Sequence, residues 1–170
     1  MVTEQNIEKS PSNGLLHWLV AAGVAIAVST IGRFLTDIGP WYRALQKSAL
    51  NPPDWAFPVA WTLIYALAVV AAVSAWRGIF NVRERFIFVA LFSLNIVLNL
   101  FWLQLFFIMK RPDLAMLEIV AFWASIVALI LFLSRFSRLA GFALAPYGLW
   151  VTFASYLNFE IVRLNSPFVG

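Results

Sequence analysis

The sequence predicts an all-α integral membrane protein, a bundle of five transmembrane helices. Its 170 residues are 62% hydrophobic and only 12% charged, and their mean hydropathy is +0.85. A soluble domain carries about a quarter charged residues, so this composition is typical of a membrane protein. The few charges also divide the chain into five mostly apolar stretches, each near the roughly 20 residues that a membrane-spanning helix needs. The length suits one compact bundle rather than two domains.

The positions of the charged residues set the predicted helices. No charged residue occurs within 55–76, 86–109 or 139–159, and Glu118 is the only one within 114–134. A further uncharged stretch precedes Arg33. The predicted spans are residues 15–35, 56–77, 86–108, 114–134 and 139–162.

The first predicted span differs from the others in composition, because it is rich in alanine and contains the single histidine, His17. A bundle of four spans with this segment as a buried amphipathic helix is the alternative, and five spans are preferred. The membrane domain is expected to cover residues 15–165. A polar N-terminal tail at 1–14 and a C-terminal tail at 166–170 flank it.

Short connections join the predicted helices, and they make consecutive helices antiparallel. Loop one, residues 36–54, is the exception, and loops of this length usually carry function or lack order. It contains Trp41, Tyr42 and the pair Pro52-Pro53. Because proline fixes the backbone and aromatic rings favour burial, loop one is expected to be a packed lid rather than a flexible linker.

Three of the predicted helices each present one face of aromatic and amide side chains. The stripes follow helical spacing and consist of Trp61 and Tyr65; of Asn95, Asn99, Trp102 and Phe106; and of Tyr147, Trp150, Ala154 and Asn158. Amides are costly in lipid, so these faces should point inward. Together they predict a pocket for a flat, apolar small molecule. The alternative is that the amides bond helices together, which is preferred for Asn158, and that the tryptophans are packing residues.

Several functional classes find no support in the sequence. There is no cysteine and only one histidine, which excludes thiolate and multi-histidine metal sites. No carboxylate pair or glycine-rich phosphate loop suggests acid–base or phosphoryl chemistry. The net charge of +4 comes from scattered basic residues, so nucleic acid is not an expected partner. Six lysines and arginines on each side of the predicted bundle leave its orientation open.

The motifs around loop one resemble the signature of the TspO/MBR family, which comprises the tryptophan-rich sensory proteins and the translocator protein, or peripheral-type benzodiazepine receptor. The resemblance covers roughly residues 31–165, and its motifs are Trp41-Tyr42, Asn51 to Trp55, Phe57 to Tyr65, Asn99 to Trp102, Phe106-Phe107 with Lys110-Arg111, Pro146-Tyr147 with Trp150, and Leu157-Asn158. The chain departs from the family pattern at Lys47 to Leu50, and at Asn95, Gln104 and Ile108.

The resemblance implies a bundle of five transmembrane helices, often dimeric, in a bacterial membrane or a mitochondrial-type outer membrane. It implies a receptor or sensor that binds porphyrin-like tetrapyrroles such as protoporphyrin IX or haem, and also sterols or benzodiazepine-type ligands, in a pocket under loop one. The matching pocket positions are Tyr42, Pro53, Trp61, Tyr65, Asn99, Trp102, Trp150 and Ala154. No cofactor is required. Two alternatives are light-dependent porphyrin degradation, for which Trp61 and Trp150 would be the reacting residues, and transport of tetrapyrroles or sterols.

Overall fold

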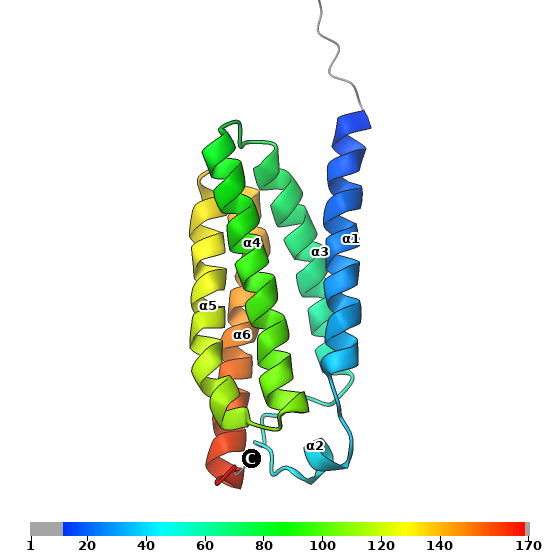
Figure 1. Ribbon diagram of the computed structural model, residues 1–170, viewed down its shortest axis with the longest axis vertical. Coiled ribbons are helices and arrows are strands. Elements are labelled where there is room, and N and C mark those ends of the chain that lie inside the picture. The colour runs from blue at the N-terminus through cyan, green and yellow to red at the C-terminus, as the bar shows by residue number, and fades with distance from the viewer. Residues whose placement is uncertain (1–11, 169–170) are drawn as a thin grey trace, which may run out of the picture.

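The computed structural model describes residues 12–168 as a bundle of long helices, with no strand in that part of the chain (Figure 1). The all-α prediction is confirmed. The helices are α1 (Ser12–Leu35), α2 (Pro40–Ala44), α3 (Ala56–Trp76), α4 (Val82–Leu103) with a π-helical extension η1 (Gln104–Ile108), α5 (Pro112–Ser134) and α6 (Arg138–Asn165). Four helical segments of the described chain are long and apolar enough to cross a membrane, and they are Gly14–Leu35, Ala56–Trp76, Val82–Ile108 and Pro112–Ser134.

Helix starts differ from the predicted boundaries where a capping residue lies outside the apolar stretch. The Asn81 side chain accepts a hydrogen bond from Arg83 N at 2.8 Å, so α4 begins at Val82 rather than at residue 86. Helix α1 begins at Ser12, within the predicted N-terminal tail. Residues 1–11 of that tail and 169–170 of the C-terminal tail lie outside the described residues.

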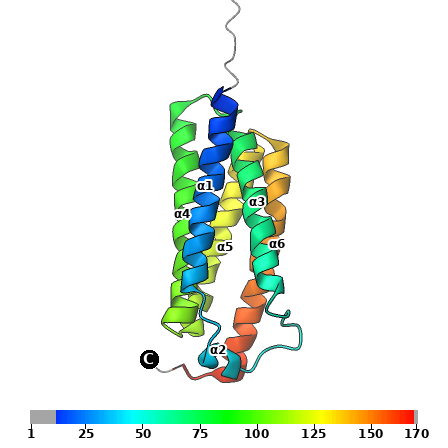
Figure 2. The same cartoon turned by 90° about the vertical axis from the view of Figure 1, so that its right-hand side faces the viewer.

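The core of the bundle lies along α5, which Figure 2 shows between α4 and α6. Phe122, Ile126, Leu129 and Leu133 are almost completely buried on the inner face of α5. Helix α1 lies at the edge of the bundle, in front of α3 and α4 (Figure 2), and Val28 is the one large side chain buried within its residues 14–35. The loose packing of α1 leaves space between it and its two neighbours.

Loop one packs under the end of the bundle where α6 terminates (Figure 1). Tyr42 is 6% exposed, and its ring centroid lies 5.6 Å from that of Phe107. Burial, and then the nearby Asp54 carboxylate, raise the pKa of Tyr42, so its hydroxyl stays protonated. Gln46 N donates to Asn165 Oδ1 and Asn165 Nδ2 donates to Gln46 O, both at 2.8 Å, which ties loop one to α6.

The π-helical segment η1 turns three consecutive side chains inward. Leu105, Phe106 and Phe107 are all buried, although successive residues of a regular α-helix point about 100° apart. Met109 N donates to Gln104 O at 2.9 Å, five residues back, which widens the turn. The segment begins and ends at Gln104 and Ile108, two positions where the sequence departs from the TspO/MBR pattern.

Candidate ligand-binding cavity

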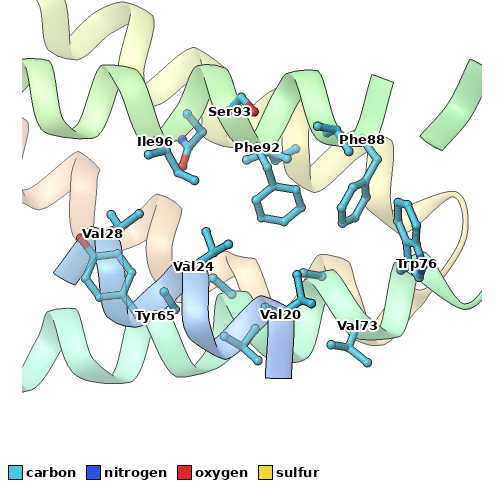
Figure 3. Close-up of a pocket in the computed structure, with 18 of the residues that line it drawn as sticks. Val20, Val24, Val28, Tyr65, Val73, Trp76, Phe88, Phe92, Ser93 and Ile96 are labelled. Carbon is cyan, nitrogen blue, oxygen red and sulfur yellow. The ribbon is translucent and has the colours of Figure 1, made fainter. Parts of the chain in front are cut away.

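A cavity of about 460 Å³ lies between α1, α3 and α4 and reaches the inner faces of α5 and α6. Its volume falls within the range of about 300–1,000 Å³ that is usual for small-molecule sites. Small and branched aliphatic side chains of α1 and α3 form one wall, and Phe88 and Phe92 project from α4 to form the other (Figure 3). Tyr65 lies at one end of the cavity and Trp76 at the other. The wall is therefore almost wholly apolar apart from Ser93, and the other polar groups lie at the ends.

The Tyr65 end of the cavity carries a hydrogen-bonded group from four helices. Tyr65 Oη donates to Asn99 Oδ1 at 3.2 Å, and Tyr147 Oη donates to Asn95 Oδ1 at 3.1 Å. Asn95 Nδ2 in turn donates to Ser125 Oγ at 2.8 Å. Within the described residues the Asn99 amide nitrogen has no hydrogen-bond partner, and Asn99 lines the cavity. This end can therefore donate a hydrogen bond to an acceptor on a bound molecule.

The Trp76 end carries aromatic and basic groups. The His17 ring centroid lies 6.2 Å from the Trp76 ring, and both residues line the cavity. The Arg85 guanidinium carbon lies 4.9 Å from the Trp76 ring centroid, a cation–π distance. The cavity thus has two amides and two phenols at one end and an indole and an imidazole at the other, and the Arg85 guanidinium lies over that indole.

Two of the site residues predicted from the sequence line this cavity, namely Tyr65 and Asn99. Trp61 lies directly behind Tyr65, stacked on it with ring centroids 5.5 Å apart, and its edge meets Tyr147 at 6.0 Å. Trp61 therefore supports two walls of the cavity without lining it. The stripe of amides on α4 does face inward, and Asn95 and Asn99 are 5% and 3% exposed.

The other predicted site residues gather at the loop-one end and do not line the cavity: Tyr42, Pro53, Trp102, Trp150 and Ala154. Aromatic rings fill the space there. Trp102 stacks on Phe106 at 4.9 Å, and the edge of Trp150 meets Phe57 at 5.8 Å. The cavity lies instead toward the opposite end of the bundle, where α1 lines it mostly with alanine and valine, joined by Leu16 and His17.

Several cavity residues were missed from the sequence. Phe88 and Phe92 extend the Asn95–Asn99 stripe by two turns at the same helical spacing, a signal that could have identified them. Ala21 and Ala25 form a small-residue pattern that usually indicates close helix contact, yet here they line open space. The position of the cavity depends on α1 standing away from α4, which no local pattern encodes.

A buried carboxyl lies near the predicted pocket residue Trp102. The hydrogen bond between Asn95 and Ser125 places these two residues side by side on the antiparallel helices α4 and α5. Trp102 lies seven residues from Asn95 toward loop one, and Glu118 lies seven residues from Ser125 in the same direction, so the two lie at the same height in the bundle. Trp102 Nε1 and both carboxylate oxygens of Glu118 are buried without a hydrogen-bond partner among the described residues. Glu118 is the one charged residue within the predicted span 114–134, and it forms no ion pair within the described part of the chain.

Replacing Glu118 with methionine is expected to raise the unfolding temperature of the detergent-solubilised protein. A buried polar group without a partner costs about 1–3 kcal/mol, and methionine fills a similar volume without that cost. Glu160→Met is the matched control, because Glu160 Oε2 lies 2.7 Å from Arg163 Nη2 and loses an ion pair. A Glu118→Met protein that melts below wild type would show that the carboxyl has a stabilising partner.

Comparison with known proteins agrees with this helical architecture. The family model described as the TspO/MBR family matches residues 19–164. The chain is 37% identical over 153 residues to the tryptophan-rich protein TspO of Chlorobaculum tepidum, covering 89% of this chain and 97% of that protein. It is 35% identical over 128 residues to protein CrtK of Rhodobacter capsulatus (75% and 79% covered) and 26% identical over 159 residues to the human translocator protein (90% and 94% covered). With its four strongly apolar helices, the chain is an integral, multi-pass membrane protein that belongs to the TspO/MBR family.

Proposed function

We propose that the protein is a membrane receptor or sensor that binds a flat apolar molecule of the tetrapyrrole class inside its helix bundle. The observation that carries this proposal is the cavity of about 460 Å³, with apolar walls and a few polar groups at its ends. The names of similar proteins, among them a tryptophan-rich sensory protein of Cereibacter sphaeroides, are consistent with a sensory role.

We further propose that α6 is a fifth membrane span. It contains 28 residues, about 42 Å of helix, and lies alongside the full length of α5 (Figure 1). Residues 139–159 carry no charge. Tyrosine, serine, glycine and asparagine lower its hydropathy, and several of them, such as Tyr147 and Asn158, are buried against the other helices rather than facing lipid.

In this proposal, loop one and the aromatic residues that lie between it and the bundle interior close that end of the bundle. Tyr42 holds loop one to Phe107, and Trp102 and Trp150 fill the space above. Opening loop one would give a ligand a route toward Trp61 and Tyr65 from this end of the bundle. Loop one would then act as a gate.

Titration with protoporphyrin IX tests ligand binding directly. We expect saturable quenching of tryptophan fluorescence, and Phe92→Leu should weaken the affinity about fivefold, because Phe92 lines the cavity and an aromatic contact with a flat ligand is worth about 1 kcal/mol. Trp150→Phe serves as the control, since Trp150 lies outside the cavity. Linear quenching that is the same in all three proteins would mean partitioning into detergent and would overturn the proposed function.

Light-dependent degradation of the bound porphyrin is the second candidate function. It is favoured by the position of Trp61, whose ring stacks on the cavity residue Tyr65 at 5.5 Å. Loss of porphyrin absorbance under illumination should then depend on Trp61 and not on Trp150, with Trp61→Phe slowing it several-fold in a protein that still binds. A rate no greater than that of free tryptophan at equal concentration would rule this activity out.

A further inference from the structure

The cavity opens sideways, between α1 and α4. Val20 and Val24 of α1 line it and are nevertheless 58% and 47% exposed, and Val89 on the facing side of α4 lines it and is 52% exposed. A side chain that both lines a cavity and is half exposed marks an opening in the wall. In a membrane protein this opening faces lipid, so a molecule dissolved in the bilayer can enter without crossing water.

Two arginines stand at the Trp76 end of this opening. Arg85 is held in place because its Nε donates to Ile79 O at 3.0 Å and its guanidinium lies over Trp76, which lines the cavity. Arg77 follows Trp76 directly, and its Nη2 lies 3.7 Å from the position that a Cβ on Gly14 would occupy, beside the first turns of α1. Neither arginine lines the cavity itself; Arg85 lies over the lining residue Trp76, and Arg77 lies between the end of α3 and the start of α1.

Neither guanidinium is neutralised within the described part of the chain. The ion pairs described there are Arg111–Asp113 and Arg163–Glu160, both at the loop-one end. The Trp76 end of the bundle has one described carboxylate, Glu84, which forms no ion pair, and five arginines: Arg77, Arg83, Arg85, Arg135 and Arg138. A guanidinium with free Nη groups binds a carboxylate through paired hydrogen bonds.

We infer that the cavity takes a molecule with a carboxylate at one end and an apolar body, with the carboxylate on Arg85 and Arg77 and the body between α1 and α4. The cavity runs from Trp76 to Tyr65, 11 residues or about 17 Å along α3, so the apolar far end of the molecule lies near Tyr65. This inference rests on the proposed function and narrows its ligand class. It selects tetrapyrroles with free propionates, or fatty acids, over neutral sterols and esters.

Protoporphyrin IX and its dimethyl ester form the matched pair of probes, because they differ only in the two carboxylates. We expect the wild-type protein to bind the acid at least about tenfold more tightly than the ester, as expected for charge-assisted hydrogen bonds. Arg85→Gln and Arg77→Gln should reduce this preference while leaving ester affinity unchanged, and Arg85→Lys should retain part of it. Arg83→Gln is the control, because Arg83 is a cation at the same end of the bundle but does not contact Trp76.

The outcomes separate the inference from the proposed function. Saturable binding of both probes with equal affinity would overturn the inference and leave the proposed function standing, whereas saturable binding of neither would overturn both. An equal loss of preference in Arg83→Gln would also overturn the inference, because it would show attraction by bulk charge. Competition with oleate distinguishes the two sources of carboxylate. If oleate displaces protoporphyrin IX, and Arg85→Gln weakens that displacement, the site also takes fatty acids. If oleate does not displace protoporphyrin IX, the site is specific for tetrapyrroles.

Discussion

Replacing Asn95 with leucine is expected to lower the stability of the bundle markedly. Asn95 is 5% exposed and joins three helices, because its side chain accepts a hydrogen bond from Tyr147 of α6 and donates one to Ser125 of α5. Leucine fills the volume of the amide but makes neither bond. The Tyr147 hydroxyl is then left buried without an acceptor, and an unsatisfied buried polar group costs about 1–3 kcal/mol.

The expected loss is about 2 kcal/mol, since hydrogen bonds between membrane helices average less than those in water-soluble cores. Reversible unfolding in mixed detergent micelles, followed by circular dichroism, measures it. Tyr147→Phe and the double variant complete a double-mutant cycle, which isolates the bond between the two residues. Because Tyr147→Phe removes the hydroxyl that Asn95→Leu leaves unpaired, the double variant should be less destabilised than the sum of the two single changes.

Ser93→Ala is the control for this cycle. Ser93 also lies on α4 and lines the cavity, but its side chain makes no hydrogen bond among the described residues. It should unfold with wild-type stability. Strict additivity in the Asn95–Tyr147 cycle would contradict the network, because it would mean that the two side chains contribute to stability independently.

The fold was predictable because lipid imposes a simple rule on sequence. A spanning helix must satisfy its own backbone and present apolar side chains, so charges occur near helix ends and divide the chain into spans. Helix α6 shows the limit of that rule. Polar residues lower its hydropathy although it is the longest helix of the described chain, and some of them, such as Tyr147 and Asn158, are buried against other helices.

The candidate site was only partly predictable, because helical spacing gives the direction of a side chain but not the distance to the next helix. Asn95, Asn99 and Tyr65 face inward as the stripes predict. Trp61 also faces inward, yet it packs against Tyr65 instead of empty space. Local patterns therefore identified the interior, and the three-dimensional packing of α1 decided which part of it remains open.

The expectation that Asn158 bonds helices together agrees with its surroundings. With its amide oriented to satisfy both neighbours, Asn158 donates to Pro112 O and accepts from Met116 N, each at 3.1 Å. Both partners belong to the first turn and a half of α5, so the Asn158 side chain links α6 to the start of α5. Glu118 could not be predicted in this way. Buried charged groups are usually paired, whereas the Glu118 carboxyl is buried without a hydrogen-bond partner among the described residues.

Filling the cavity from α3 is expected to abolish ligand binding without unfolding the protein. Ala72 lines the cavity one turn before the end of α3, and a phenylalanine there would occupy space between α1 and α4 that is now empty. We expect Ala72→Phe to weaken protoporphyrin IX binding by more than about tenfold, a loss of at least 1.4 kcal/mol. Stability should hold or rise by about 1 kcal/mol, because filling a cavity adds van der Waals contacts.

Ala66→Phe provides the matched control, because Ala66 lies on the exposed face of the same helix and does not line the cavity. Both variants add the same ring to α3, so any general effect of phenylalanine on the helix or on detergent binding is common to them. Ala72→Phe with a lowered unfolding temperature would indicate overpacking, and Ala72→Leu then repeats the test with a smaller side chain. Wild-type affinity in a stable Ala72→Phe protein would place the ligand outside this cavity, and the aromatic cluster of Trp102 and Trp150 beneath loop one would then be the site to open.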